Sequence, residues 1–116
     1  MWYAVISQDV DDSLELRKLH RPAHVERITE LDAQGRVLIA GPHPALHPQD
    51  LHPQDLHPQD LHSQDASNES FSGSLIVADF DSLEDAQAWA DQDPFVLNGI
   101  YAKVMVKPFT KVFPKK

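Results

Sequence analysis

The sequence predicts an α+β domain in which strands and helices follow one another in the order β-α-β-β-α-β. Three observations predict it: short apolar segments rich in β-branched residues, two longer segments with helical spacing of apolar residues, and turn residues between them. The predicted strands are residues 2–8, 36–41, 73–80 and 100–109, and the predicted helices lie within 13–35 and 81–93.

The N-terminal part is expected to form a strand and then a helix in two pieces. WYAVISQ (2–8) is apolar and aromatic, and Ser13 follows it as a candidate helix cap. Because proline breaks a helix interior but is tolerated at a first position, Pro22 predicts a short turn over 13–19 and a main helix from Pro22, ending by Gly35. The apolar stripe of this helical stretch is expected to be Leu16, Leu19, Ala23, Ile28 and Leu31.

The C-terminal part is expected to complete the sheet. RVLIAG and GSLIVADF read as two strands, and Asp81 or Ser82 caps a helix that Asp93-Pro94 ends. In the last strand the alternation predicts one face with Ile100, Ala102, Val104 and Val106, and a second face with Tyr101, Lys103, Met105 and Lys107.

This element order is that of a ferredoxin-like domain, a four-stranded antiparallel sheet with two helices on one face. The other face of the sheet is apolar in places, so we expect it to pair with a second copy of the chain. Without the repeat and its polar flank, roughly 85–90 residues remain, a small core that gains from such pairing. The expected assembly is a homodimer through the open sheet face.

Residues 46–65, LHPQDLHPQDLHPQDLHSQD, repeat a five-residue unit that carries His47, His52, His57 and His62. In an extended chain rising ~3.1 Å per residue, neighbouring histidines would lie roughly 15 Å apart. Ligands of one zinc ion each lie within about 2.1 Å of it, so the spacing disfavours a specific metal site. We expect one domain over 1–116, with 43–71 as an inserted loop between the second and third strands. Metal binding by the histidine-rich repeat is the alternative.

Composition excludes several classes of function. A net charge of −8 disfavours nucleic acid as a partner, because phosphate backbones repel an acidic chain. The chain has no cysteine, which removes disulfides and thiolate chemistry. The first residues lack the basic region and the apolar length of a signal peptide or membrane span. We expect a cytoplasmic protein with a small-molecule substrate, without a membrane, nucleic-acid or cofactor partner.

His24 is the first candidate for chemistry. It lies near the expected start of the main helix, where the dipole disfavours the imidazolium and leaves a neutral ring able to accept a proton. Arg17 and Arg21 precede it by two turns and one turn and could hold an anionic group. Exposed polar positions on an amphipathic helix explain the same residues without any function, and the residues alone favour that interpretation.

Asp93 is the second candidate. It is expected at the end of a helix, where a carboxylate opposes the dipole, and a residue placed against local preference could orient a histidine. A plain Asp-Pro turn explains it too, and this is again the stronger interpretation from the residues alone. Gly41 and Pro42 end a strand and could bring backbone close to a ligand, or form a simple turn.

Taken together, WYAVISQD, RPAHVERI, RVLIAGP, SGSLIVADF and AWADQDPFVLNGIYAKVMVKPF resemble the YciI-like (YCII-related) family. The likeness covers nearly all of 1–41 and 72–114 and does not extend through 43–71. It implies a dimeric α/β-barrel of ferredoxin-like subunits with an active site centred on a histidine–aspartate pair, which falls on His24 and Asp93. Some relatives act on hydroxylated aromatics by a dechlorinating or lyase-like reaction.

The resemblance also implies a cleft wall that contains Arg17, Arg21, Gly41, Pro42 and Ser74. His24 would act as general acid/base, Asp93 would fix its tautomer, and an arginine would hold an anionic group. Such a site suits isomerisation or elimination on a small anionic or aromatic compound without a cofactor. The alternative is a non-catalytic module of the same fold that binds a small ligand.

Overall fold

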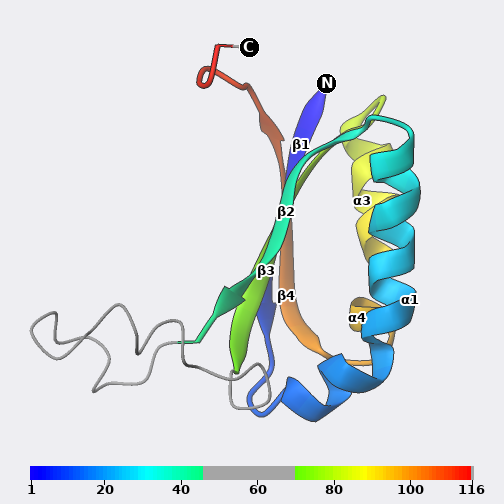
Figure 1. The fold of residues 1–116 in the computed structure, drawn as a ribbon, viewed down its shortest axis with the longest axis vertical. Helices are drawn as coiled ribbons and strands as arrows, with labels where there is room; N and C mark the ends of the chain where they lie inside the picture. The colour runs from blue at the N-terminus through cyan, green and yellow to red at the C-terminus, as the bar shows by residue number, and fades with distance from the viewer. Residues whose placement is uncertain (46–69, 116) are drawn as a thin grey trace, which may run out of the picture.

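The computed structural model describes residues 1–45 and 70–115. They form a four-stranded antiparallel sheet in the order β2-β3-β1-β4, with the helices against one face (Figure 1). The strands are β1 (Trp2–Asp9), β2 (Val37–Pro44), β3 (Phe71–Asp79) and β4 (Tyr101–Phe109), and the helices are α1 (Leu14–Ala33), α3 (Leu83–Asp91) and α4 (Pro94–Leu97). The predicted fold class and element order are confirmed, and α4 is an addition.

Residues 14–33 form one continuous helix, so the predicted break before Pro22 is wrong. Pro22 cannot donate a backbone N–H to the carbonyl of Lys18. Both residues are exposed, so water can satisfy that carbonyl. The helix accommodates the proline by bending, and Figure 1 shows its first turns at an angle to the rest.

The inward face of α1 differs from the predicted apolar stripe. Its buried residues are Arg17, His24 and Leu31, which follow one another at steps of two turns. Leu16 and Leu19, which were expected to face the core, are 38% and 70% exposed. The first two of these buried residues, Arg17 and His24, line a cavity, whereas Leu31 packs in the apolar core.

The apolar core lies between the sheet and the second half of α1 and α3. The sheet contributes Tyr3, Val5, Ile76 and Ala78, and the opposing layer includes Leu31, Ala86 and Ala90. At the start of α3, the backbone N–H of Asp85 donates to the hydroxyl of Ser82 at 3.1 Å, which confirms the predicted cap. The apolar core therefore fills one end of the space between the sheet and the helices. The polar face of α1 lines the other end.

A β-bulge changes the expected face of Tyr101. In β4 the pairing with β1 passes from Gln8–Lys103 to Asp9–Tyr101, so Ala102 is an extra residue without a partner. This shift turns Tyr101 to the helix-covered side, where its ring packs against His24 and Phe95. The sequence placed Tyr101 with Met105 on the opposite face, and that prediction is wrong because regular alternation does not foresee a bulge.

The face of the sheet opposite the helices carries exposed apolar side chains. Ile6, Ile39, Met105 and Phe109 are between 37% and 57% exposed. Pairing of two chains through this face stays a prediction. No helix of the described residues is long and apolar enough to cross a membrane.

β2 and β3 pair over a longer stretch than the sequence predicted, because β2 extends to Pro44 and β3 begins at Phe71. Beyond them, the N–H of Ala45 donates to the carbonyl of Ser70 at 2.9 Å, so the two ends of the connecting segment are joined. The repeat at 46–65, and with it the metal-binding alternative, lies outside the described residues.

Candidate active site

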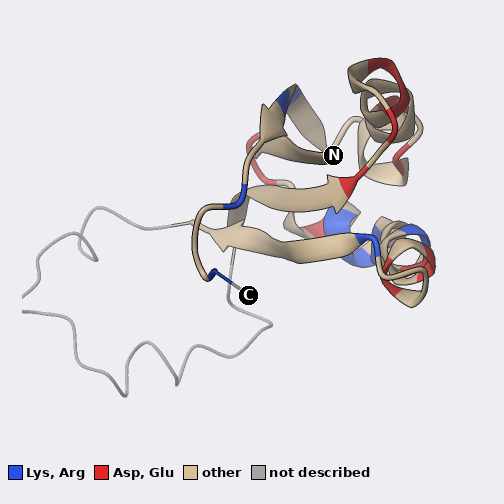
Figure 2. Cartoon of the chain, turned by 90° about the horizontal axis from the view of Figure 1, so that it is seen from above, with Lys and Arg blue, Asp and Glu red and all other residues tan. Residues whose placement is uncertain are grey.

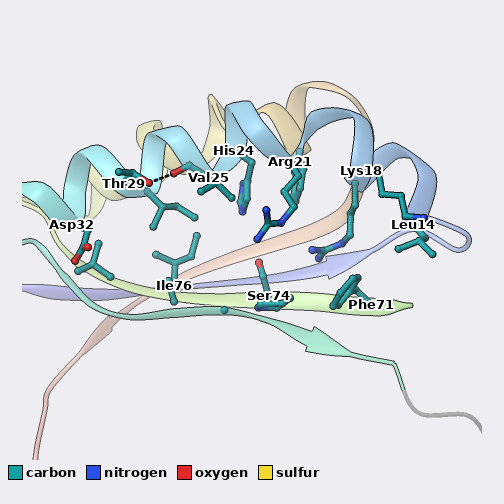
Figure 3. A pocket seen from close by; sticks show the side chains of 17 residues that line it. Leu14, Lys18, Arg21, His24, Val25, Thr29, Asp32, Phe71, Ser74 and Ile76 are labelled. Atoms are coloured by element: carbon teal, nitrogen blue, oxygen red, sulfur yellow. Dashed lines mark hydrogen bonds between the residues drawn. The ribbon is translucent and has the colours of Figure 1, made fainter. Parts of the chain in front are cut away.

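A cavity of about 810 Å³ lies between α1 and the strands β2 and β3 (Figure 3). Apolar side chains form much of its wall, among them Val25, Ile28, Phe71, Ile76 and Phe95. The polar and charged lining includes Arg17, Lys18, Arg21, His24 and Ser74, all five from residues on α1 or β3. Such a volume and such walls suit a small molecule with an apolar body and a few polar groups.

His24 and Asp93 meet beside this cavity. The Nδ1 atom of His24 lies 2.8 Å from Oδ1 and 2.9 Å from Oδ2 of Asp93, and both residues are buried. An ionised carboxylate only accepts hydrogen bonds, so Nδ1 carries a proton, and in the neutral ring the free lone pair is on Nε2. The His24 ring extends from α1 toward the cavity (Figure 3), which leaves Nε2 as the atom able to take a proton from a ligand.

The position of His24 in its helix corrects one expectation. Because α1 begins at Leu14, His24 lies in the middle of the helix rather than near its N-terminus. The dipole acts mainly on the first and last turns, so it has little effect on this ring. The carboxylate of Asp93 is the neighbour that fixes the tautomer of His24.

The setting of Asp93 also differs from the prediction. Asp93 does not end α3, which stops at Asp91, but caps α4, where its Oδ1 accepts from the N–H of Phe95 at 2.8 Å. A carboxylate at this end of a helix is favourable, so the residue is not in conflict with its local structure. The same cap fixes the carboxylate for its contact with His24.

Arg27 supports the carboxylate from its other side. Its Nη1 lies 3.9 Å from Oδ2 of Asp93, and its Nη2 donates to the carbonyl of Trp89 at 2.8 Å. The guanidinium also stacks on the Trp89 ring, 4.5 Å from its centroid. Burial lowers the pKa of Arg27 from its ordinary value, and the charges of Asp93 and Glu30 oppose that effect. Arg27 thus provides a positive charge beside a buried negative one.

Aromatic rings fix the orientation of the His24 ring. The Phe95 ring stacks on it with centroids 3.9 Å apart and an interplanar angle of 5°. Tyr101 meets it edge-on, at 6.4 Å and 86°. With Nδ1 held by Asp93 and one ring face covered by Phe95, His24 has a single orientation relative to the cavity.

Arg17 is engaged in a buried ion pair. Its Nε and Nη2 donate to the two oxygens of Asp9 at 2.6 and 2.8 Å, and Nη2 also donates to the carbonyl of Gly73 at 3.0 Å. Ser13 is the N-cap residue of α1, as predicted, but its hydroxyl donates to Asp9 and makes no side-chain cap bond to the helix. Only Nη1 of Arg17 has no hydrogen bond within the described residues, so much of this side chain fixes the N-terminal end of α1 to the sheet.

Arg21 is the more available cation. Its side chain is exposed, lines the cavity and has no ion-pair partner among the described residues (Figure 3). Lys18 lies beside it, 3.8 Å from the exposed carboxylate of Glu15. Figure 2 shows that the coloured residues of α3 are acidic, whereas α1 carries both basic and acidic residues. The basic charge near the mouth of the cavity therefore comes from α1.

Ser74 and Tyr101 form a hydroxyl pair at the sheet side of the site. The two oxygens lie 2.7 Å apart, and either can be the donor. Burial raises the pKa of Tyr101 to about 12, although the hydrogen bond with Ser74 acts in the opposite direction. The phenol is therefore neutral across the physiological range. Ser7 is opposite Ser74 in the register of β1 and β3. Its buried hydroxyl makes no hydrogen bond within the described residues.

All the residues expected from the sequence lie in or beside this site. Gly41 and Pro42 line the cavity from β2, with Arg17, Arg21, His24 and Ser74. Asp93 is not part of the wall and reaches the cavity through His24. Sequence reasoning missed Asp9, Arg27, Phe95 and Tyr101, of which Phe95 adjoins Asp93-Pro94 and could have been found as the first turn of a capped helix. No cluster in the described residues could hold a metal ion.

Comparison with known proteins identifies the family. The model of the YCII-related domain matches residues 1–56 and 57–110. This chain belongs to the YCII-related family. Protein YciI of Escherichia coli O6:H1 is 46% identical over 113 residues, which are 97% of this chain and 100% of the relative. An uncharacterized protein of Haemophilus influenzae is 39% identical over the same shares. The resemblance found in the sequence is confirmed, but the expectation that it does not extend through 43–71 is wrong, because the two matched segments meet within the repeat at 46–65.

A solved structure shares the fold of this YCII-related chain. It is the 5-chloro-2-hydroxyhydroquinone dehydrochlorinase TftG from Burkholderia phenoliruptrix, in complex with 2,5-dihydroxybenzoquinone. The TM-score is 0.70 at 19% identity, over 95% of this chain and 94% of the other. At this identity the likeness shows the fold.

Proposed function

We propose that this protein binds a small planar compound with acidic or hydroxyl groups in the cavity beneath α1, and that His24 acts on it as a general acid/base. The observation that carries the proposal is the pairing of His24 Nδ1 with Asp93 at 2.8 Å, on a ring that lines the cavity. A histidine held in one tautomer beside a small-molecule cavity is the arrangement that proton transfer requires.

The chemistry follows from the free lone pair of Nε2. His24 removes a proton from a carbon or hydroxyl of the ligand, and the imidazolium formed is stabilised by Asp93. The proton then returns to a different atom of the ligand in an isomerisation. In an elimination the C–X electron pair leaves with X as an anion, and the proton taken by His24 passes to solvent. Neither route needs an added oxidant or reductant.

The class of ligand follows from the wall of the cavity. Phe71, Phe95 and Ile76 suit the faces of a ring, and Arg21 supplies a cation without a protein partner among the described residues. The fold neighbour is named for a chlorinated hydroxyhydroquinone and is in complex with 2,5-dihydroxybenzoquinone, which agrees in size and polarity with such a ligand.

We also propose that the working unit is a homodimer formed through the open face of the sheet. Ile6, Ile39, Met105 and Phe109 leave apolar surface exposed there, and no helix of the described residues covers it. Burying such a surface against a second copy is favourable by about 25 cal/mol per Å² of apolar area.

The test compares wild-type protein with His24→Ala. Purified chains are incubated with 5-chloro-2-hydroxyhydroquinone and chloride release is measured, and binding of 2,5-dihydroxybenzoquinone is measured by calorimetry. Turnover that falls by roughly 10²–10⁴-fold in H24A, with the fold intact by circular dichroism, supports the proposal. Equal turnover in the variant contradicts it. Binding without turnover in the wild type favours a non-catalytic ligand-binding module.

A further inference from the structure

Three hydroxyl groups gather on the helix-covered side of the sheet, below His24, and the acid/base scheme does not use them. Ser7, Ser74 and Tyr101 come from three neighbouring strands, β1, β3 and β4. Ser74 lines the cavity, and Figure 3 shows its side chain directed up toward α1, where the His24 ring is directed down. The site therefore has a polar floor as well as a basic wall.

Tyr101 fixes the Ser74 hydroxyl. The two oxygens lie 2.7 Å apart, and the Tyr101 ring is wedged edge-on against both His24 and Phe95. The phenol has the proton needed to donate to Ser74, because burial keeps its pKa at about 12. When Tyr101 donates, the proton of Ser74 is free to point into the cavity.

Ser7 is the cross-strand neighbour of Ser74, although the two hydroxyls make no hydrogen bond with each other. The two residues are opposite one another in the β1–β3 register, and such pairs have Cβ atoms about 4.5–5.5 Å apart. The Ser7 hydroxyl is buried and has no partner among the described residues, and an unpaired buried hydroxyl destabilises a fold by about 1–3 kcal/mol. A role in the site would account for keeping it there.

We propose that Ser74, supported by Tyr101, positions a hydroxyl oxygen of the ligand opposite His24. In one arrangement Tyr101 donates to Ser74 and Ser74 donates to the ligand oxygen. In the other the ligand hydroxyl donates to Ser74, whose own proton turns to Tyr101. Because only hydroxyl protons rotate, Ser74 stays bonded when the ligand oxygen changes from a hydroxyl to an anion. The inference rests on the proposed function and adds a requirement for a ring hydroxyl.

The experiment measures whether the site recognises a hydroxyl group. Benzoate and its 2-, 3- and 4-hydroxy isomers are titrated by calorimetry into the full chain and into Ser74→Ala, Tyr101→Phe and Thr29→Val. Thr29 is the matched control, because it also lines the cavity but its hydroxyl donates to Val25 of its own helix at 2.8 Å (Figure 3). Tyr101→Phe keeps the ring packing, and so it tests the same unit if Ser74→Ala does not fold.

We expect one hydroxybenzoate to bind the wild type about two- to tenfold more tightly than benzoate, the value of one hydrogen bond. S74A loses this ratio and Y101F reduces it, whereas T29V retains it. A ratio that survives in S74A, or that is absent in the wild type while benzoate binds, overturns the inference and leaves the proposed function standing. Failure of all four acids to bind the wild type counts against the proposed function and the inference together.

Discussion

The Nδ1 atom of His24 lies 2.8 and 2.9 Å from the two oxygens of Asp93, although 69 residues separate them in the chain. Asp93 also accepts from the N–H of Phe95, the residue whose ring stacks on His24. One short helix therefore supplies the carboxylate and the ring that together hold the histidine.

Asp93→Asn is expected to reverse the His24 tautomer without unfolding the protein. The amide oxygen can still accept from Phe95 and cap α4, but the amide nitrogen would donate to Nδ1 and move the proton to Nε2. Nitrogen chemical shifts of His24 report the change directly, and any turnover should fall roughly 10²–10⁴-fold. Asp91→Asn, on an exposed residue at the end of α3, is the control. An unchanged tautomer in D93N would contradict this account of the dyad.

Tyr101 should make stability depend on alkaline pH. Its pKa is raised from 10 to about 12 in the folded chain, so between these values the unfolded chain has lost the proton that the folded chain keeps. Stability is therefore full below pH 10 and falls as the pH rises through 12, by about 2–3 kcal/mol for this group. Urea unfolding across this range should show a smaller fall in Tyr101→Phe. An equal fall in both proteins would disprove the assignment.

The buried pair of Asp9 and Arg17 should show strong coupling. Removing one partner leaves an uncompensated charge, so Asp9→Asn or Arg17→Met is expected to destabilise the chain by roughly 3–5 kcal/mol, and the double variant by less than the sum. Chemical unfolding of the four proteins gives the coupling energy. Glu15→Gln, which removes the exposed partner of Lys18, should change stability by under about 1 kcal/mol. Additive effects of the two buried variants would refute the prediction.

Gly73 should not tolerate a side chain. A Cβ at this position would collide with the carbonyl oxygen of Ser7 on the neighbouring strand, so Gly73→Ala must push β1 and β3 apart. We expect a loss of roughly 1–3 kcal/mol or more in thermal or urea unfolding. Gly41→Ala is the matched control, because a Cβ there meets open space. Equal stability of the two variants would show that the strands adjust freely.

The proposed dimer should dissociate when a charge is placed at the centre of the open sheet face. Ile6 is 37% exposed and pairs with Met105 and Leu75 on its two sides, so Ile6→Lys places a charge in the middle of the interface. Sedimentation should give twice the chain mass for the wild type and the chain mass for I6K. Leu19→Lys, on an exposed position of α1, should leave the mass unchanged. A wild type that sediments as a monomer would exclude the proposed assembly.

The sequence predicted the strands and α3 well, because β-branched runs and a capped apolar stripe are local signals. It failed where long-range contacts decide. Pro22 lies inside a helix because its exposed side lets water satisfy the freed carbonyl, and Tyr101 turns inward because of a bulge that pairing with β1 creates. His24 and Asp93 were both named, but the physical reasons for them were wrong: neither residue owes its setting to the end of a helix where the sequence placed it.

The hydrogen bond between Ala45 and Ser70 has a practical consequence for engineering. It closes the β2–β3 pair beyond the last strand residues, so we expect the described residues that face His24 to stay in place when the number of amino acids between these two positions changes. Loop closure costs only about 0.6 kcal/mol for each doubling of length. An epitope or a whole reporter domain can therefore be inserted between 45 and 70 as a handle, on a chain whose cavity is then built from the same residues.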